Sequence, residues 1–487
     1  MKKLFVLILL SVFVSISYSQ YYRLSSLGNL FIAIEDIDNE LNLYDFGGNP
    51  AWIVEGERIN RTWSHLYFSS HSGNYKRLYE PEILNRYGAN FVRVQNLGRS
   101  GVFKGYATYE VEERKNLYRS LLLYPYDGKA FFVIDTTVGN YRYAGPSVSF
   151  DYGFELVRNL FTGIRLKYTL IDGLKDVYTS ARTIYRNIEG IWGLAMRMNR
   201  NLSIGFSFEF TNSQEKIEAK SEDLYDAEIY FFRGDQYSIK RRSNLVEFKL
   251  NDKGYGGYVQ SNLTFDKLSF SIRMGYKQIG KYLFIPYGLI EEYEFGYSNF
   301  ESYTSKFMGR LKVSKLLTIG SFFQYEYVNT WSKHSERNLL LWHGKFKFIK
   351  GGIGTWLKMR ERSPAVGFEV IYRLSTIDSL KYIDNKFTNI NGFDYQLKGG
   401  IEYVLSEKIT LRVGAGYRFF NKDILTGYGG GSRYYELTSG VDVLQKYVLI
   451  MSFWKFKNNI FGGFAGNDFG VYRSRNGFTI SFVVKLI

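Results

Sequence analysis

The chain has 487 residues, of which 63 are basic and 47 acidic, so its formal net charge is +16; it contains 42 Tyr, 40 Phe, only 6 Pro and no Cys. Without Cys there are no disulfides, no thiolate nucleophile or metal ligand, and no lipidated cysteine as a surface anchor. A basic balance also occurs in nucleic-acid-binding proteins, but no nucleic-acid-binding module is recognisable, so we expect no nucleic-acid partner.

The first residues have the pattern of a secretory signal peptide. Lys2 and Lys3 precede an apolar stretch from Leu4 to about Val14, and small residues follow before Gln20. A membrane-spanning helix needs about 20 apolar residues, and serines interrupt this run too early. We therefore predict that residues 1–19 are a signal peptide cleaved near Ser19/Gln20 and that the mature chain is exported.

Residues 20–60 differ from the rest of the chain because they are acidic and have weak strand periodicity. Between Gln20 and Glu57 there is a single basic residue, Arg23, against seven acidic ones: Glu35, Asp36, Asp38, Glu40, Asp45, Glu55 and Glu57. We predict that this stretch is a plug or periplasmic segment.

From about residue 61 to the chain end, apolar and polar residues alternate in segments of about ten. The clearest is the last, where Phe478, Ile480 and Phe482 alternate with polar neighbours. This pattern is typical of a tilted strand that crosses a bilayer with one face in lipid. No later stretch could form a spanning helix, and without one only a closed barrel can cross a membrane. A β-propeller would instead need a repeat of about 40–50 residues, which we do not find.

We therefore predict an all-β fold, a transmembrane antiparallel β-barrel over residues 61–487 with an even number of strands between 14 and 18. The excess of Tyr and Phe suits the aromatic girdles of such a barrel. Tight turns are expected at 158–159, 199–201, 266–267 and 314–315. Longer polar loops are expected at about 171–186, 212–244, 279–302 and 329–338. Between Ser375 and Ser406 the up-and-down order cannot be assigned.

One N-terminal stretch resembles outer-membrane barrels of the FadL type. Ala33-Ile34-Glu35-Asp36 is followed by Phe46-Gly47-Gly48-Asn49-Pro50-Ala51-Trp52, and in that family an acidic residue precedes an Asn-Pro-Ala segment. The resemblance implies an N-terminal plug and inward passage of hydrophobic small molecules, with Glu35, Asp36, Asn49, Pro50 and Ala51 as plug residues. Trp52 departs from the small residue expected there, and Ile487 from the usual terminal aromatic.

Basic residues share one strand face in the C-terminal half of the chain. A basic side chain facing lipid near the midplane costs about 2–4 kcal/mol, so we expect these residues to face the lumen. Three roles are open: pairing with the acidic plug, attraction of anions, or contact with anionic lipid headgroups. The candidates are Lys306, Arg310, Lys312, His343, Lys345, Lys347, Lys358, Arg360, Arg412 and Arg418.

Enzymatic sites are weakly indicated. Ser69–Asn74 vaguely resembles the His-x-Ser-Asn-Gly stretch of outer-membrane phospholipases, but the order differs and a polar turn explains the same residues. Gly427–Gly431 lacks the Lys-Ser/Thr of a phosphate loop, and the four His show no ligand spacing. We expect no enzyme activity, no cofactor and no metal.

The pattern favours an outer-membrane barrel that acts as a passive channel or transporter for small, possibly hydrophobic, molecules. One alternative is a non-transport barrel that anchors, or belongs to, an export or assembly machine. Another is an anion-selective pore. Outer-membrane lipid is an expected partner and a small-molecule cargo a possible one, and the identity of any protein partner is left open.

Overall fold

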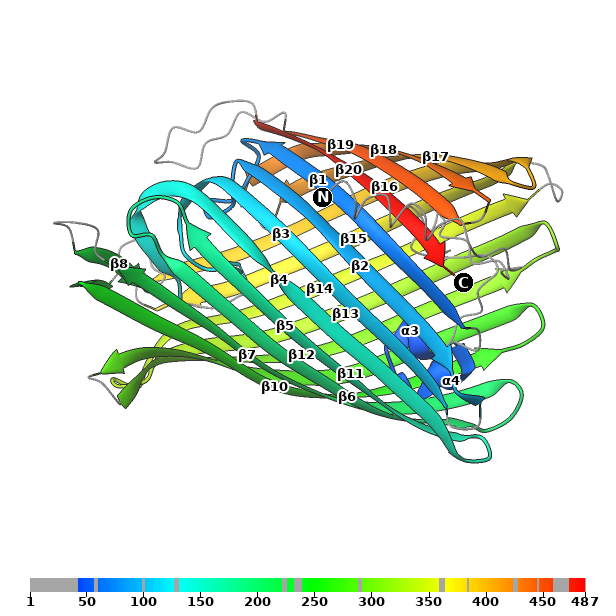
Figure 1. Ribbon diagram of the computed structural model, residues 1–487, viewed down its shortest axis with the longest axis horizontal. Helices are drawn as coiled ribbons and strands as arrows, with labels where there is room; N and C mark the ends of the chain where they lie inside the picture. The colour runs from blue at the N-terminus through cyan, green and yellow to red at the C-terminus, as the bar shows by residue number, and fades with distance from the viewer. Residues whose placement is uncertain are drawn as a thin grey trace, which may run out of the picture.

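The structure is a computed structural model, and it forms one large antiparallel barrel (Figure 1). It describes residues 43–56, 60–98, 101–126, 131–220, 226–231, 239–287, 291–358, 364–382, 385–423, 428–444, 446–458 and 473–486. Among these residues, eighteen strands close a ring in which each strand pairs with the next and β20 pairs back with β1. The predicted all-β barrel is confirmed, with a strand number at the upper limit of the expected range.

The strands of the ring run alternately up and down. They are β1 (Arg61–Gly73), β2 (Ile83–Asn96), β3 (Val102–Ser120), β4 (Val133–Val157), β5 (Leu160–Lys175), β6 (Arg182–Arg197), β7 (Leu202–Lys220), β10 (Leu245–Thr264), β11 (Leu268–Tyr287), β12 (Glu291–Lys312), β13 (Leu317–His334), β14 (Leu339–Lys358), β15 (Ala365–Lys381), β16 (Lys386–Ser406), β17 (Ile409–Asp423), β18 (Tyr428–Val443), β19 (Tyr447–Asn458) and β20 (Arg473–Leu486). The two other strands, β8 (Ala227–Phe231) and β9 (Ile239–Ser243), form a hairpin that pairs with the start of β4.

The outer face of the ring is apolar. On β7, Ile204, Phe206, Phe208 and Phe210 are each at least 40% exposed, whereas the alternate serines, such as Ser207, are buried. A row of exposed aromatic and aliphatic side chains is costly in water but favourable in lipid. The period-two pattern of the sequence therefore becomes a wall with a lipid-facing outer side. No helix among the described residues is both long and apolar enough to cross a membrane.

The two ends of the barrel differ in their connections. The four predicted tight turns are confirmed, since β4 ends at Val157 and β5 begins at Leu160, and the links after β6, β10 and β12 have four, three and four residues. The start of β1 and the end of β20 lie at this same end. The strand ends that the longest connections join, after β1, β3, β7 and β19, lie at the opposite end. Because short turns are periplasmic in such barrels, we call the short-turn end the inner end and the other the outer end.

The predicted long loops are largely wrong, because the strands continue through them. β5 and β6 extend into 171–186, and β11 and β12 extend through most of 279–302. Beyond the lipid-facing band the outward residues of a strand need not be apolar, so the alternation that marks a lipid-embedded strand disappears while the hydrogen-bond ladder continues. The ambiguous stretch between Ser375 and Ser406 is a plain hairpin of β15 and β16.

Three short helices lie at the inner end (Figure 1). They are α3 (Leu43–Gly47), the 3-10 turn η1 (Pro50–Trp52) and α4 (Ile53–Gly56). Asn49 caps η1 by accepting a hydrogen bond from the Ala51 amide, and Pro50 stands at the first helical position, as this turn chemistry favours. Residues 20–42 lie outside the described residues. We call residues 43–56 the inner segment.

Candidate functional site: the lumen and its two ends

The inner face of the barrel is polar and charged. On each strand it consists of the residues that alternate with the exposed apolar ones. Asp151 lies between outward Phe150 and Tyr152, and Arg165 lies between Ile164 and Leu166. Charged groups on this face are spared the cost of contact with lipid. The lumen is therefore a hydrophilic path through an apolar cylinder.

Asn49 fastens the inner segment to the barrel wall. Its side chain is fully buried, and its Nδ2 donates hydrogen bonds to the backbone oxygens of Leu194 on β6 and Phe206 on β7, both 3.1 Å away. Its Oδ1 accepts from the Ala51 amide at 3.0 Å. The Asn49 side chain thus forms hydrogen bonds both within its own turn and to two strands of the wall.

Glycines in the wall create the space for this contact. A Cβ at Gly193 would lie 2.0 Å from Asn49 Oδ1, and a Cβ at Gly163 would lie 2.6 Å from the carbonyl carbon of Pro50. Real Cβ atoms do not approach other atoms this closely, so both positions require glycine as long as the inner segment is docked. The neighbouring strands β5 and β6 therefore form a complementary docking surface for η1, which we call the seat of η1.

Charged and polar side chains hold the inner segment from several directions. Tyr44 Oη donates to Asp151 Oδ2 at 2.5 Å, and Arg165 forms two hydrogen bonds of 2.6 and 2.7 Å with the same carboxylate. Glu55 pairs with Arg197 at the end of β6. The segment therefore contributes a neutral hydroxyl to an acidic group of the wall and a carboxylate to a basic one.

The segment also has an apolar side. Trp52 packs edge-on against Phe161 on β5, with ring centroids 5.5 Å apart. Leu43 and Ile53 are fully buried in the same cluster, which includes Val94 of β2. The inner segment is therefore packed into the wall as well as hydrogen-bonded to it.

The outer end carries a separate apolar cluster. Residues 121–123 and 131–133, from the connection between β3 and β4, pack against inward side chains of β7, β10 and β11, including Ile217, Phe248 and Leu283. Polar contacts tie this connection to the wall, since Arg114 donates to the Leu123 oxygen at 2.9 Å. We call residues 121–123 and 131–133 with their apolar partners the outer cluster.

A buried ion pair supports the outer cluster. Lys175 Nζ lies 2.6 Å from Asp135 Oδ2, and the two side chains are 2% and 0% exposed. Thr179 donates a further hydrogen bond to the same carboxylate, and Thr137 Oγ1 lies 2.7 Å from the lysine. Every charge in this pair is matched, as a buried pair requires.

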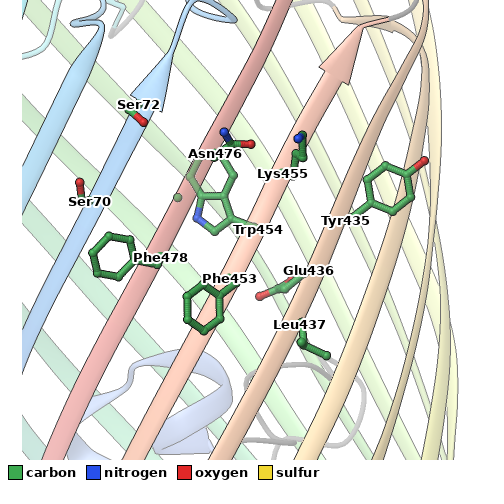
Figure 2. Close-up of a pocket in the computed structure, with 11 residues that line it drawn as sticks. Ser70, Ser72, Tyr435, Glu436, Leu437, Phe453, Trp454, Lys455, Asn476 and Phe478 are labelled. Carbon is green, nitrogen blue, oxygen red and sulfur yellow. The ribbon is translucent and has the colours of Figure 1, made fainter.

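A pocket of about 450 Å³ lies on the outer face of the barrel, across β18, β19, β20 and β1 (Figure 2). Outward side chains surround it, and Trp454 and Gly477 contribute to its lining. It is lined by Ser70, Ser72, Tyr435, Glu436, Leu437, Phe453, Trp454, Lys455, Asn476, Gly477 and Phe478. Because most of these residues belong to the lipid-facing parity, the pocket lies outside the lumen.

The comparisons with known proteins identify a family. The family described as "Family of unknown function (DUF6850)" matches residues 50–451. The chain belongs to this family. Among curated proteins, no sequence matches.

Solved structures of other barrels are similar to this chain at low identity. The outer-membrane transporter YddB from Escherichia coli has 7% identity and a TM-score of 0.44, with 88% of this chain and 81% of that chain covered. The copper transporter OprC has 8% identity, a TM-score of 0.44 and the same coverage. The siderophore receptor PirA from Pseudomonas aeruginosa has 10% identity and a TM-score of 0.41, again covering 88% and 81%. We derive neither a substrate nor a mechanism from these likenesses.

Six of the predicted basic residues of this DUF6850 member lie on the inward parity: Lys306, Arg310, Lys312, Lys358, Arg412 and Arg418. Their surroundings differ. Lys306 Nζ lies 4.8 Å from the ring centre of Phe46, in the inner segment. Arg412 is 1% exposed and donates to Glu402 at 2.7 Å. The sequence therefore groups residues such as Lys306 and Arg412, which the fold separates into a contact with the inner segment and an internal ion pair.

Three of the predicted lumen residues point the other way. His343, Lys345 and Lys347 have the same parity as Ile353, which is 61% exposed on the outer face, and β14 has no irregularity between them. The lumen assignment of these three is therefore wrong. The sequence pattern suggests a change of face between Phe348 and Leu357, but the continuous ladder forbids it. Arg360 lies outside the described residues.

The predicted plug residues divide in the same way. Asn49, Pro50 and Ala51 are buried against the wall, as described above, whereas Glu35 and Asp36 lie outside the described residues. The matching family is described only as one of unknown function, so the FadL resemblance and its hydrophobic cargo stay a hypothesis.

Sequence reasoning missed the wall glycines and the inward cations Lys350, Arg373 and Lys398. A signal for Arg373 was present, because Val366, Phe368, Val370 and Tyr372 form an alternating apolar row that places odd-numbered residues of β15 inside. Nothing in the sequence marks Gly163 or Gly193, because their partners are more than 100 residues away.

Proposed function

We propose that this protein is an outer-membrane barrel that carries small polar solutes across the membrane, and that the inner segment closes the lumen at the inner end. The observation that carries the proposal is the seat of η1, in which wall glycines admit Pro50 and Asn49 against β5, β6 and β7. These wall positions need glycine only while the inner segment is docked. This is expected if the segment closes the lumen reversibly. The hydrophilic inner face supplies the path behind it.

The contacts of the inner segment suit reversible closure. Beside the apolar cluster of Trp52 and Ile53, they include hydrogen bonds and ion pairs to the wall, such as Gln260 Nε2 to the Gly47 oxygen at 2.7 Å. A hydrogen bond of this kind contributes only about 0.5–1.5 kcal/mol net, because water can replace it. On release of the segment, water would solvate these polar groups, and the small apolar cluster would be the main cost.

The inner face favours a polar cargo over the hydrophobic one that the FadL resemblance implies. A hydrophobic solute would meet charged side chains such as Arg165, Lys306 and Arg418 along the wall, and their desolvation is unfavourable. A polar solute can instead exchange its water contacts for these groups.

The test is planar-bilayer conductance of the purified mature chain, with and without residues 20–56. We expect the complete chain to show rare, small openings and the shortened chain to conduct steadily. A heat-modifiable band on gels and a β-type circular dichroism spectrum would establish that both forms are folded. Two folded forms with no current would overturn the proposal and favour the alternative of an anchoring or assembly component.

A further inference from the structure

A row of cations runs across the inner wall from β14 to β17. Lys350 lies directly opposite Arg373 across the β14–β15 pair, and Gln396 lies opposite Arg418 across the β16–β17 pair. Lys398 is on the same face of β16, two residues beyond Gln396. We call Lys350, Arg373, Lys398 and Arg418 the cation row. Like charges placed opposite one another in a sheet are unfavourable, so this row needs an explanation.

The carboxylates near the row are shared between the cations. Arg373 and Arg418 both bind Asp394, at 2.8 Å and 2.7 Å, so one negative charge serves two guanidinium groups. Glu369 lies opposite Lys398 across the β15–β16 pair, and Glu436 approaches the stem of Lys398 over Gly416. Four cations thus face three carboxylates.

The two lysines have no ion-pair or hydrogen-bond partner within the part of the chain that the structure describes. Lys398 is only 6% exposed. Lys350 has a ring contact alone, with its Nζ 5.4 Å from the centre of Phe322. Arg412, by contrast, is an inward cation that is compensated by Glu402 at 2.7 Å. An ammonium group without an ion pair or hydrogen bond is costly where it is buried, as in Lys398, or half-buried, as in Lys350. This cost is relieved when an anion binds.

An aromatic wall adjoins the row on β17, β18 and β19. The Arg418 guanidinium lies 4.0 Å from the ring centre of Phe420. Tyr434 lies opposite Arg418 in the ladder, and its ring centre is 4.6 Å from that of Phe456. Trp454 continues the group, 5.6 Å from Phe456. The aromatic rings of β18 and β19 therefore lie next to the end of the cation row at β17.

We propose that the cation row and the aromatic wall form one binding site for a small organic anion, with a phosphate or carboxylate on the lysines and arginines and a flat ring against Tyr434, Trp454 and Phe456. Guanidinium groups bind such anions through paired hydrogen bonds, and aromatic faces stack on flat ligands. The site rests on the proposed function, because it names the class of solute that the lumen carries.

The test is isothermal titration calorimetry on the complete mature protein in detergent, with phenyl phosphate as the probe. The test variant carries Lys350→Gln and Lys398→Gln. The matched control carries Lys345→Gln and Lys347→Gln, which removes the same two charges from the outer face of β14. Gel mobility before and after heating establishes that all three barrels are folded.

We expect phenyl phosphate to bind at least tenfold more weakly to the test variant than to the parent, the order expected when charge-assisted hydrogen bonds are lost, and to bind the control unchanged. Inorganic phosphate and phenol, which each carry half of the recognised chemistry, should bind the parent more weakly than phenyl phosphate. Equal affinity in the test variant and the parent would overturn the inference, as would equal loss in the control. Phenol binding as tight as phenyl phosphate would also overturn it.

Binding and transport fail separately in this design. Calorimetry reports the site whether or not the lumen opens. If phenyl phosphate binds as expected while the chain lacking residues 20–56 stays silent in bilayers, the site stands and the transport proposal falls. If that chain conducts and no variant binds phenyl phosphate, the site falls and the transport proposal stands.

Discussion

Gly163 of β5 and Pro50 of η1 are in direct backbone contact at the inner end of the lumen, where a Cβ on residue 163 would lie 2.6 Å from both the carbonyl carbon and the oxygen of Pro50. Backbone atoms cannot turn aside as the tip of a side chain can. The absence of a side chain at residue 163 therefore allows the inner segment to dock at this position.

Replacement of Gly163 by Ala should loosen the inner segment without harming the barrel. The new methyl group collides with Pro50, and overpacking of this kind costs about 1–3 kcal/mol. We expect more frequent channel openings in planar bilayers and an unchanged melting temperature of the barrel. Gly257→Ala is the control, because a Cβ there has no atom within 4 Å. Equal conductance of the two variants would contradict the inference that Gly163 leaves room for Pro50.

Asn49→Ala should release the same segment by removing its hydrogen bonds to the Leu194 and Phe206 oxygens. Two such bonds contribute about 2 kcal/mol, so the released fraction should rise about 30-fold. Hydrogen–deuterium exchange of the amides of residues 43–56 measures this directly. Asn389→Ala, which removes an exposed bond to Asp378, should leave that exchange unchanged. Slow exchange in both variants would mean that other contacts hold the segment.

The Asp135–Lys175 pair should be more important for stability than any exposed pair. Asp135→Ala leaves the buried lysine uncompensated, which costs about 3–5 kcal/mol. The comparison is Asp172→Ala, which breaks the pair with Arg182, whose side chains are each 52% exposed; we expect a cost of about 0–1 kcal/mol. Urea unfolding in lipid vesicles gives both values. A difference below the measurement error would show that the outer cluster does not depend on the buried pair.

The outer face of β7 should tolerate charge poorly. Phe208→Lys places an ammonium group in the middle of the exposed apolar row, which costs about 2–4 kcal/mol if lipid surrounds it. Phe387→Lys changes an outward phenylalanine that is 66% exposed, against 42% for Phe208, at the outer-end start of β16, where we expect little cost. Urea titration of folding into vesicles measures both. Equal effects would contradict the assignment of a lipid-facing band on β7.

The contacts of the inner segment could not be foreseen from the sequence, although its acidic character and its Asn-Pro-Ala turn were visible. The turn forms locally, since Asn49 accepts the Ala51 amide two residues on. Its partners Leu194 and Phe206 are about 150 residues away, and only closure of the ring brings them to it. The outward orientation of Lys345 and Lys347 likewise depends on residues farther along the strand. The continuous ladder gives them the same parity as the lipid-facing residues nearer the inner end of β14.

The sequence by itself determined the class of fold, the lipid-facing rows and the tight inner turns, because alternation and turn chemistry are properties of residues that are neighbours in the chain. Only the tertiary structure decided how far the strands extend, which cations share a face, and where the inner segment docks. Those features depend on the pairing of strands that are separate in sequence, and one residue of slippage would turn every side chain of a strand to the opposite face.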